Sequence, residues 1–288
     1  MKKSLTLLAV VLFTMSAFGQ EAVKLINRGD SLFKEKKYAE ALEIYDKVIP
    51  TLEQDKVKES LYYAAMAALN TAKNEVALAY FDKAISAKNA DASLKFELSD
   101  CNQYKGLVYV RLKDFANAMA SYEKALELAP AKPGPIYYSA ASAAFNMNNF
   151  EKAVEYFGKS YDAGNKPEDA ILNKAMAYKR LNNDSLYEVT LITGFEKFPG
   201  NKNISSRLAA IYFTDGNNFY KSGVTILNAT LKKVNEKKLK VEDAEYKSEI
   251  AKVNEAYSKA VEVLKKSQEL DPSNANVQKL IDACKPVK

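Results

Sequence analysis

The chain has 288 residues and a formal net charge of +6, from 42 lysines and arginines against 36 aspartates and glutamates. It contains no histidine, no tryptophan and only two cysteines. This composition excludes catalysis by a histidine acid or base, serine–histidine and cysteine–histidine nucleophile pairs, and histidine-ligated metal sites. Glycine-rich phosphate loops are also absent from the sequence. We therefore expect a protein that is not an enzyme and that needs no cofactor or metal.

Residues 1–19 have the order of a secretory signal peptide. Two lysines precede an apolar run from Leu5 to Phe13, and small residues follow as far as Gly19. A membrane anchor is the alternative, but the apolar run is shorter than the roughly 20 residues that a spanning helix needs. We expect cleavage before Gln20, export to the periplasm or cell envelope, and no transmembrane segment in the mature chain. Cleavage lowers the net charge to +4, which is too weakly basic to indicate nucleic acid.

One helical pattern recurs along the rest of the chain. A small residue is followed four positions later by a large apolar residue and three positions after that by a second small or β-branched residue, so all three lie on one helix face. The five copies are Ala41/Tyr45/Val48, Ala77/Phe81/Ala84, Ala118/Tyr122/Ala125, Ala153/Phe157/Ser160 and Ala260/Leu264/Ser267. The first four begin 36, 41 and 35 residues apart, which is the length of one helix–turn–helix unit. These trios predict an all-α protein in which each hairpin stacks on its neighbours.

The clearest copy lies between Ser99 and Pro130. Its first helix carries Gly106 and Tyr109, and its second helix carries the Ala118 trio before the proline. This segment resembles the tetratricopeptide repeat, whose motif has Gly and Tyr three apart on the first helix, then Ala, Phe and Ala on the second, then Pro. The resemblance implies a right-handed α-solenoid of helix–turn–helix repeats. The resemblance agrees with the physical requirement for small residues, such as Gly106 and Ala118, where two helices cross closely.

On this basis residues 20–200 hold about five repeats. The fifth is degenerate, because Tyr187, Leu191 and Gly194 stand where the usual trio is expected.

Residues 201–288 form a C-terminal region in which the predicted helices are longer than those of the repeats. Residues 203–240 read as one long helix or as two abutting helices interrupted near Gly216, and residues 243–270 read as another long helix. We predict a terminal repeat with an elongated hairpin, followed by a short capping helix from Asn274 that covers the open apolar end.

The two cysteines, Cys101 and Cys284, are separated by several predicted repeats. A disulfide requires Cα atoms within roughly 7 Å of one another. We therefore expect two free, buried thiols.

The resemblance also implies where a partner binds. In tetratricopeptide proteins the first helices line a concave groove, and we call the matching positions here the first-helix face. Apolar and aromatic side chains predominate there, which favours a protein or peptide partner with apolar anchors. The residues of this face are Tyr62, Met66, Leu69, Gln103, Leu107, Val110, Tyr138, Ser142, Phe145, Leu172, Met176 and Lys179, with Arg111, Asn146 and Arg180 at the helix ends. The alternative for each is packing against the adjacent first helix.

Chaperone-binding members of the family hold a terminal carboxylate with lysine, asparagine and arginine. The matching positions here are Ile26, Asp30, Tyr63, Asp100 and Tyr104. The sequence therefore does not predict binding of a chaperone tail.

A second surface lies at the tip of the predicted long hairpin, where lysines are concentrated. They are Lys232, Lys233, Lys237, Lys238 and Lys240. Such a patch suits anionic lipid, envelope polysaccharide or an acidic partner, and the alternative is a solvated helix end.

The sequence thus predicts an exported, non-catalytic scaffold that binds protein partners in the cell envelope through its groove. The alternative is an envelope-surface protein that acts through the lysines of the hairpin tip. The two differ in salt dependence, because contacts made by exposed lysines weaken at high ionic strength and apolar contacts do not.

Overall fold

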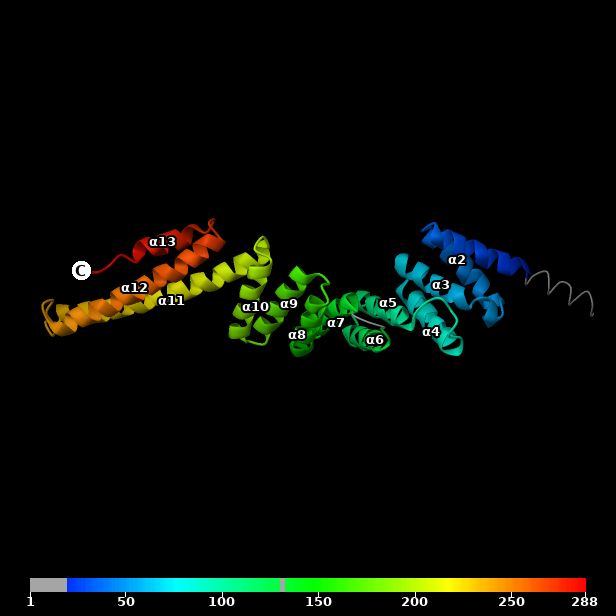
Figure 1. Cartoon of the computed structure of the whole chain (residues 1–288), viewed down its shortest axis with the longest axis horizontal. Coiled ribbons are helices and arrows are strands. Elements are labelled where there is room, and N and C mark those ends of the chain that lie inside the picture. The colour runs from blue at the N-terminus through cyan, green and yellow to red at the C-terminus, as the bar shows by residue number, and fades with distance from the viewer. Residues whose placement is uncertain (1–19, 130–132) are drawn as a thin grey trace, which may run out of the picture. The chain divides into compact units, whose positions relative to one another are not determined.

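The computed structural model describes residues 20–129 and 133–288 (Figure 1). The predicted leader, residues 1–19, and Pro130 lie outside the described residues. Within the described ranges the chain forms helices and no β-strand, which confirms the all-α prediction. The chain divides into two compact units, residues 1–165 and 166–288.

The first unit consists of helical hairpins in chain order. Residues 20–34 are helical and precede α2, and two short 3-10 helices, η1 (Ile49–Thr51) and η2 (Gln54–Lys56), lead to the next hairpin. Helices α3 and α4, α5 and α6, and α7 and α8 pair with each other, and each hairpin contacts the next. The α-helices are α2 (Tyr38–Val48), α3 (Lys58–Asn70), α4 (Asn74–Ala90), α5 (Leu98–Arg111), α6 (Phe115–Leu128), α7 (Gly134–Asn146) and α8 (Phe150–Asp162).

The predicted trios form the interior of these hairpins. Every member of the four trios in the first unit has a relative exposure of 4 % or less. Each second helix therefore buries a large side chain between two smaller ones, as the spacing predicts. Complete burial of a large apolar side chain contributes about 1.5–3 kcal/mol to folding, so the repeated trio is a main source of stability in each hairpin.

The hairpin turns share one backbone conformation. Six turn residues in the described ranges have a left-handed backbone with φ between 55° and 62°, namely Lys36, Ala72, Lys113, Asn148, Asn182 and Lys237. The amide that follows each of them donates a hydrogen bond to the carbonyl five residues earlier, as from Asp114 N to Tyr109 O at 2.9 Å. This Schellman arrangement satisfies carbonyls at the end of the first helix and reverses the chain.

Polar contacts also join successive hairpins. The Asp30 carboxylate accepts hydrogen bonds from the Tyr45 hydroxyl in its own hairpin, at 2.8 Å, and from the Ser60 hydroxyl in the next, at 3.2 Å. Burial raises the pKa of the Asp30 carboxyl, although both hydroxyls favour its charged form. Farther along, the Tyr80 hydroxyl donates to Asp46 at 2.9 Å and links α4 to α2.

The second unit contains one hairpin of ordinary length and one long hairpin. Tyr187, Leu191 and Gly194 are buried on α10, so the degenerate fifth trio still occupies the hairpin interior. The helices are α9 (Pro167–Arg180), α10 (Asp184–Lys197), α11 (Lys202–Asn235), α12 (Ala244–Leu270) and α13 (Ala275–Ala283).

The long hairpin is formed by α11 and α12, which lie along one another in Figure 1. Helix α11 continues through Gly216 for 34 residues, so the alternative of one long helix is confirmed. Gly216 marks a close helix contact instead of a break, because a Cβ atom there would lie 2.5 Å from Leu264 Cγ. The same holds two turns later, where a Cβ on Gly223 would lie 2.5 Å from Tyr257 Cε1. Since Leu264 belongs to a trio, α11 and α12 pack as the two helices of an elongated repeat.

Helix α13 begins after Asn274, whose side chain accepts a hydrogen bond from the amide of Asn276 at 3.2 Å. It contacts α12 and buries Val277 and Cys284 in the apolar cluster of the long hairpin. The predicted capping helix is therefore present.

Candidate functional site

The first-helix face of the first unit carries side chains that are only partly buried. Leu107 retains 36 % of its exposure, whereas the trio residues on the second helices retain 4 % or less. The half-buried residues of the face are Tyr62, Met66, Gln103, Val110, Tyr138, Ser142 and Phe145. Helices α3, α5 and α7 thus present a largely apolar surface that is not fully buried by packing within and between the hairpins.

Tyr62 belongs partly to the core. Its ring stacks on Phe96, with centroids 5.1 Å apart and planes 4° apart, and meets the edge of Phe81 at 6.5 Å. Burial raises the pKa of the Tyr62 hydroxyl. Only part of this ring therefore remains for contact with a partner.

Leu69 and Arg111 make contacts within the protein. Leu69 is buried, at 4 % exposure, so its side chain does not belong to the available surface. Its carbonyl oxygen accepts a hydrogen bond of 2.7 Å from Nη1 of Arg111, which reaches across from α5 to the end of α3. The exposed guanidinium of Arg111 therefore ties two first helices together.

Helix α7 shows the same division between packing and exposure. Tyr138 meets Phe157 edge-on at 5.6 Å, and Phe145 meets Phe150 edge-on at 5.2 Å. Asn146 is exposed at the end of the helix, and its side-chain amide donates to Ser142 O at 2.8 Å. Both rings help to hold α7 against α8 while keeping part of their surface in solvent.

Asp100, one of the positions that do not match a chaperone-binding site, adds a charge to α5. Its half-buried carboxylate forms no hydrogen bond or ion pair with another described residue. Burial and, to a lesser degree, the neighbouring Glu97 raise the pKa of the Asp100 carboxyl. Burial and then the Asp100 charge raise the pKa of Tyr104. An unpaired, partly desolvated carboxylate beside an apolar surface suits a hydrogen-bond donor or cation from a partner.

The remaining residues of the first-helix face lie on α9, in the second unit. Leu172 and Met176 are half-buried and Arg180 is exposed. Lys179 is exposed and forms an ion pair of 2.7 Å with Asp184 at the start of α10.

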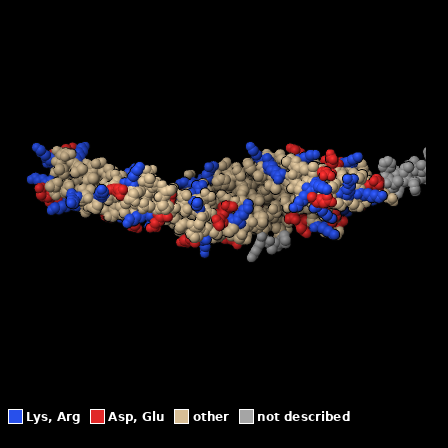
Figure 2. Space-filling model, turned by 90° about the horizontal axis from the view of Figure 1, so that it is seen from above, with Lys and Arg blue, Asp and Glu red and all other residues tan. Residues whose placement is uncertain are grey.

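The lysines of the hairpin tip are exposed, but acidic residues accompany them. Lys233 pairs with Glu245 at 2.7 Å, and Lys238 pairs with Glu236 at 2.7 Å. The backbone amide of Lys240 donates to the Asp243 carboxylate at 2.8 Å. Red and blue surfaces are intermingled at this end of the hairpin in Figure 2. The tip is therefore of mixed charge, because Glu236 after α11, Asp243 before α12 and Glu245 on α12 lie among the lysines.

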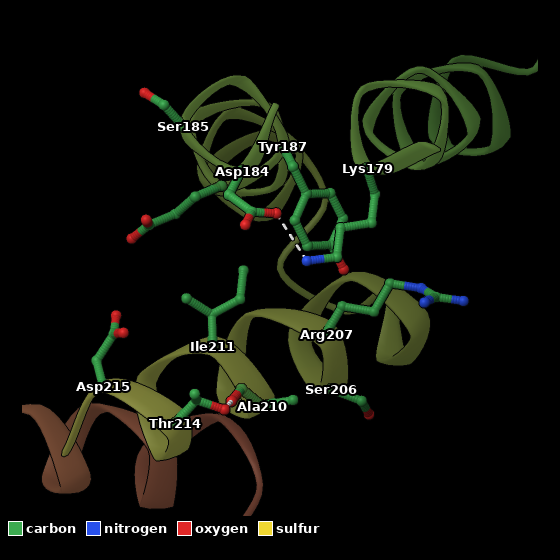
Figure 3. Close-up of a pocket in the computed structure, with 11 residues that line it drawn as sticks. Lys179, Asp184, Ser185, Tyr187, Ser206, Arg207, Ala210, Ile211, Thr214 and Asp215 are labelled. Carbon is green, nitrogen blue, oxygen red and sulfur yellow. Dashed lines mark hydrogen bonds and ion pairs between the residues drawn. The ribbon is translucent and has the colours of Figure 1, made fainter. Parts of the chain in front are cut away.

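A cleft beyond the predicted sites runs along α11, against α10 in its first part (Figure 3) and against α12 in its second. It comprises two adjoining cavities of about 550 Å³ and about 520 Å³, which share Glu188 and Asp215 in their linings. Tyr187 and Ile211 give the first cavity an apolar interior, and Phe219 and Val263 do so for the second. We call these two cavities together the α10–α11 cleft.

The charges in this cleft are arranged unevenly. Arg207 lines only the first cavity, Lys266 lines only the second, and the carboxylates of Glu188 and Asp215 border both. Neither carboxylate forms a hydrogen bond or ion pair with another described residue. Burial, followed by the charges of Glu188 and Asp215, raises the pKa of the Tyr212 hydroxyl, which belongs to the lining of the second cavity. The repeat pattern did not predict the cleft. Lys179 and Tyr187 were assigned to the fifth repeat, and most of the other lining residues lie beyond it, where the sequence motif is lost.

No group of three or more histidine, cysteine, aspartate or glutamate residues in the described part of the chain is placed to hold a metal ion. Among the helices that the structure describes, none has the length and apolar character to cross a membrane.

Comparison with known proteins agrees with the hairpin geometry. The family model of the tetratricopeptide repeat matches residues 102–132 and 134–163, which cover α5 to α8. The chain contains tetratricopeptide repeats over these residues. It is 31 % identical over 134 residues to a TPR repeat-containing protein of Methanocaldococcus jannaschii, covering 46 % of this chain and 22 % of the relative. The chain thus spans about a fifth of that relative's length.

Solved structures show the same fold. The C-terminal part of a TPR repeat-containing protein from Cytophaga hutchinsonii aligns with a TM-score of 0.53 and 19 % identity, over 89 % of this chain and 99 % of that one. YrrB, described as a TPR protein with an unusual peptide-binding site, aligns with a TM-score of 0.53 and 19 % identity, over 66 % of this chain and 95 % of that one. Tetratricopeptide repeat proteins are generally non-catalytic and act as scaffolds for protein interactions.

Proposed function

We propose that this tetratricopeptide repeat protein is a scaffold of the bacterial cell envelope that binds a protein partner on the first-helix face of its first unit. One observation carries the proposal. Apolar side chains from three consecutive first helices remain partly exposed there, with Leu107 at 36 %, and monomers rarely leave such a surface without a binding role. The peptide-binding site in YrrB's description is consistent with a partner of this kind.

The site is a protein-binding surface and not an active site. Apolar side chains supply the contact area, and Asp100 supplies a carboxylate to orient the partner. We favour this surface over the hairpin tip because the tip lysines lie beside Glu236, Asp243 and Glu245, which reduce the attraction for an anionic surface.

The envelope location rests on the lysine–apolar–small order of residues 1–19. Intact-mass measurement on protein isolated from its own organism tests it. A mass that begins at or near Gln20 supports export, and a mass that retains residues 1–19 contradicts it.

Partner binding is tested with two leucine variants of similar exposure. Leu107 lies on α5 with 36 % exposure, and Leu128 lies at the end of α6 with 38 % exposure. Cross-linking in the native organism followed by mass spectrometry identifies the partners of wild type, Leu107→Asp and Leu128→Asp. We expect Leu107→Asp to lose the partner that wild type and Leu128→Asp retain. Equal recovery by all three proteins contradicts the proposal.

A further inference from the structure

We propose that the α10–α11 cleft is a second binding site, which takes an extended protein segment by inserting one lysine or arginine side chain between Glu188 and Asp215. This site is separate from the first-helix face of the first unit, because its lining residues all belong to the second unit. Lys179 of α9 is the one residue that it shares with the part of the first-helix face in the second unit.

The size of the cleft suits a peptide. Ligand pockets in proteins have volumes of roughly 300–1,000 Å³, and each of the two adjoining cavities falls in this range, at about 550 Å³ and about 520 Å³. Because the two share a border at Glu188 and Asp215, a segment that passes from one to the other crosses that border. Consecutive side chains of an extended segment then reach the apolar interior of each cavity and the carboxylates between them.

The charges decide which side chain lies at the border. Glu188 and Asp215 have no partner among the described residues, and both are partly buried. Tyr212 lines the second cavity together with Glu188 and Asp215. Burial and then the charges of both carboxylates raise the pKa of the Tyr212 hydroxyl. A cation placed there gains two carboxylate partners and an aromatic neighbour, and such contacts strengthen as water is excluded.

The basic residues of the cleft favour a segment over a free cation. Arg207, which lines only the first cavity, and Lys266, which lines only the second, repel a second positive charge and suit carbonyl or carboxylate oxygens. The interior beside Ile211 and Tyr187, which face one another from α11 and α10 in Figure 3, suits an apolar side chain. One central cation with apolar and oxygen-bearing neighbours is the pattern of a protein segment.

Selection from a random heptapeptide phage library tests the proposal with the mature chain, residues 20–288. We expect the selected peptides to be enriched in lysine or arginine next to an apolar residue. Binding of the synthesised peptides should fall by roughly tenfold or more in the double variant Glu188→Gln/Asp215→Asn, because two charge-assisted contacts are lost. The matched control is Glu196→Gln/Glu269→Gln, which makes the same charge change at exposed positions of the same unit and should bind as wild type.

Each contrary outcome is distinct. Failure to enrich basic peptides overturns the proposal, as does equal binding by wild type and the Glu188→Gln/Asp215→Asn variant. Binding of spermidine with no binding of peptides shows a site for small cations and also overturns it. Peptides that are lost in Leu107→Asp and retained in Glu188→Gln/Asp215→Asn occupy the first-helix face, so they bear on the proposed function and contradict a peptide site in the cleft.

Discussion

Gly106 lies so close to Tyr122 that a Cβ atom on the glycine would come within 2.6 Å of Tyr122 Cε1. No real Cβ atom tolerates such a distance, so the ring of the second helix occupies the space that a side chain on the first helix would need. The Gly and aromatic positions of the repeat are therefore one packing unit. Gly29 and Tyr45 form the same pair in the first hairpin, where the corresponding distance is 3.0 Å.

Gly106→Ala should destabilise the protein by about 1–2 kcal/mol, because overpacking outweighs the gain in helix propensity from alanine. Urea denaturation measures the loss. Gly200→Ala is the control, since no atom lies within 4 Å of its added Cβ, and it should change stability by about 0.5 kcal/mol or less. If Gly106→Ala is as stable as the control, the close packing is not present in solution.

Tyr122→Ala should cost about 3–5 kcal/mol, because it removes a buried ring from the hairpin interior. Lys124→Ala, at an exposed position two residues along, should cost about 0.5 kcal/mol or less. Thermal and chemical denaturation give both values. Similar losses for the two variants would show that the predicted helix register is wrong.

Much of the fold was predictable from the sequence because the repeat encodes it locally. The trio spacing identified the buried face of each second helix, and every predicted trio is buried. The capping helix and the two free, buried cysteines were also predicted correctly. Each of these features depends on residues close in sequence or on the rule that a repeat array must cover its end.

The candidate site was less predictable, because exposure depends on neighbouring hairpins. Leu69 was expected on the first-helix face, yet it is buried, and Arg111 binds the Leu69 carbonyl. The sequence predicted a basic patch at the hairpin tip, but in the structure Glu245 of α12 forms an ion pair with Lys233. The α10–α11 cleft combines residues of α9, α10, α11 and α12, and most of them lie outside the repeat motif.

Asp30 should make stability depend on pH in the acidic range. Its pKa is raised in the folded state, so the folded protein binds a proton more tightly than the unfolded chain. The contribution of Asp30 to stability is therefore fully present below the unfolded pKa and is lost as pH rises from about 4 through the folded pKa. Asp30→Asn should remove this component, and urea denaturation of both proteins between pH 3 and 7 measures the difference.

Asp30→Ala should instead lose about 1–3 kcal/mol at neutral pH, since it leaves the buried Tyr45 hydroxyl without its acceptor. Asn retains a side-chain oxygen that can accept the hydrogen bond from Tyr45, so Asp30→Asn and Asp30→Ala should change the free energy of unfolding by different amounts or in opposite directions. Identical pH profiles for wild type and Asp30→Asn would contradict the assignment to Asp30.

Both cysteines should resist thiol reagents in the folded protein. Cys101 is completely buried, and burial raises the pKa of its thiol to about 12; burial also raises the pKa of Cys284. Thiolate is the reactive form of cysteine, so Ellman's reagent at pH 8 should react slowly with the native protein. After denaturation it should react with two thiols per chain. An exposed reference, Ser248→Cys, should react at once. Two fast thiols in the native protein would contradict the buried assignment, and none after denaturation would indicate a disulfide.

Ala72→Gly should stabilise the protein, although glycine is usually the poorer residue. Ala72 holds a left-handed backbone at φ 57° in the turn between α3 and α4, and a side chain in that conformation costs about 1 kcal/mol. Glycine removes that cost, and the added freedom of the unfolded chain offsets part of it, so we expect a gain of about 0.5 kcal/mol. Ala79→Gly is the matched control, because Ala79 is exposed within α4, where the same change should lose about 0.5–1 kcal/mol. Opposite signs in urea denaturation support the shared turn conformation, whereas a loss in both variants means that Ala72 is not left-handed in solution.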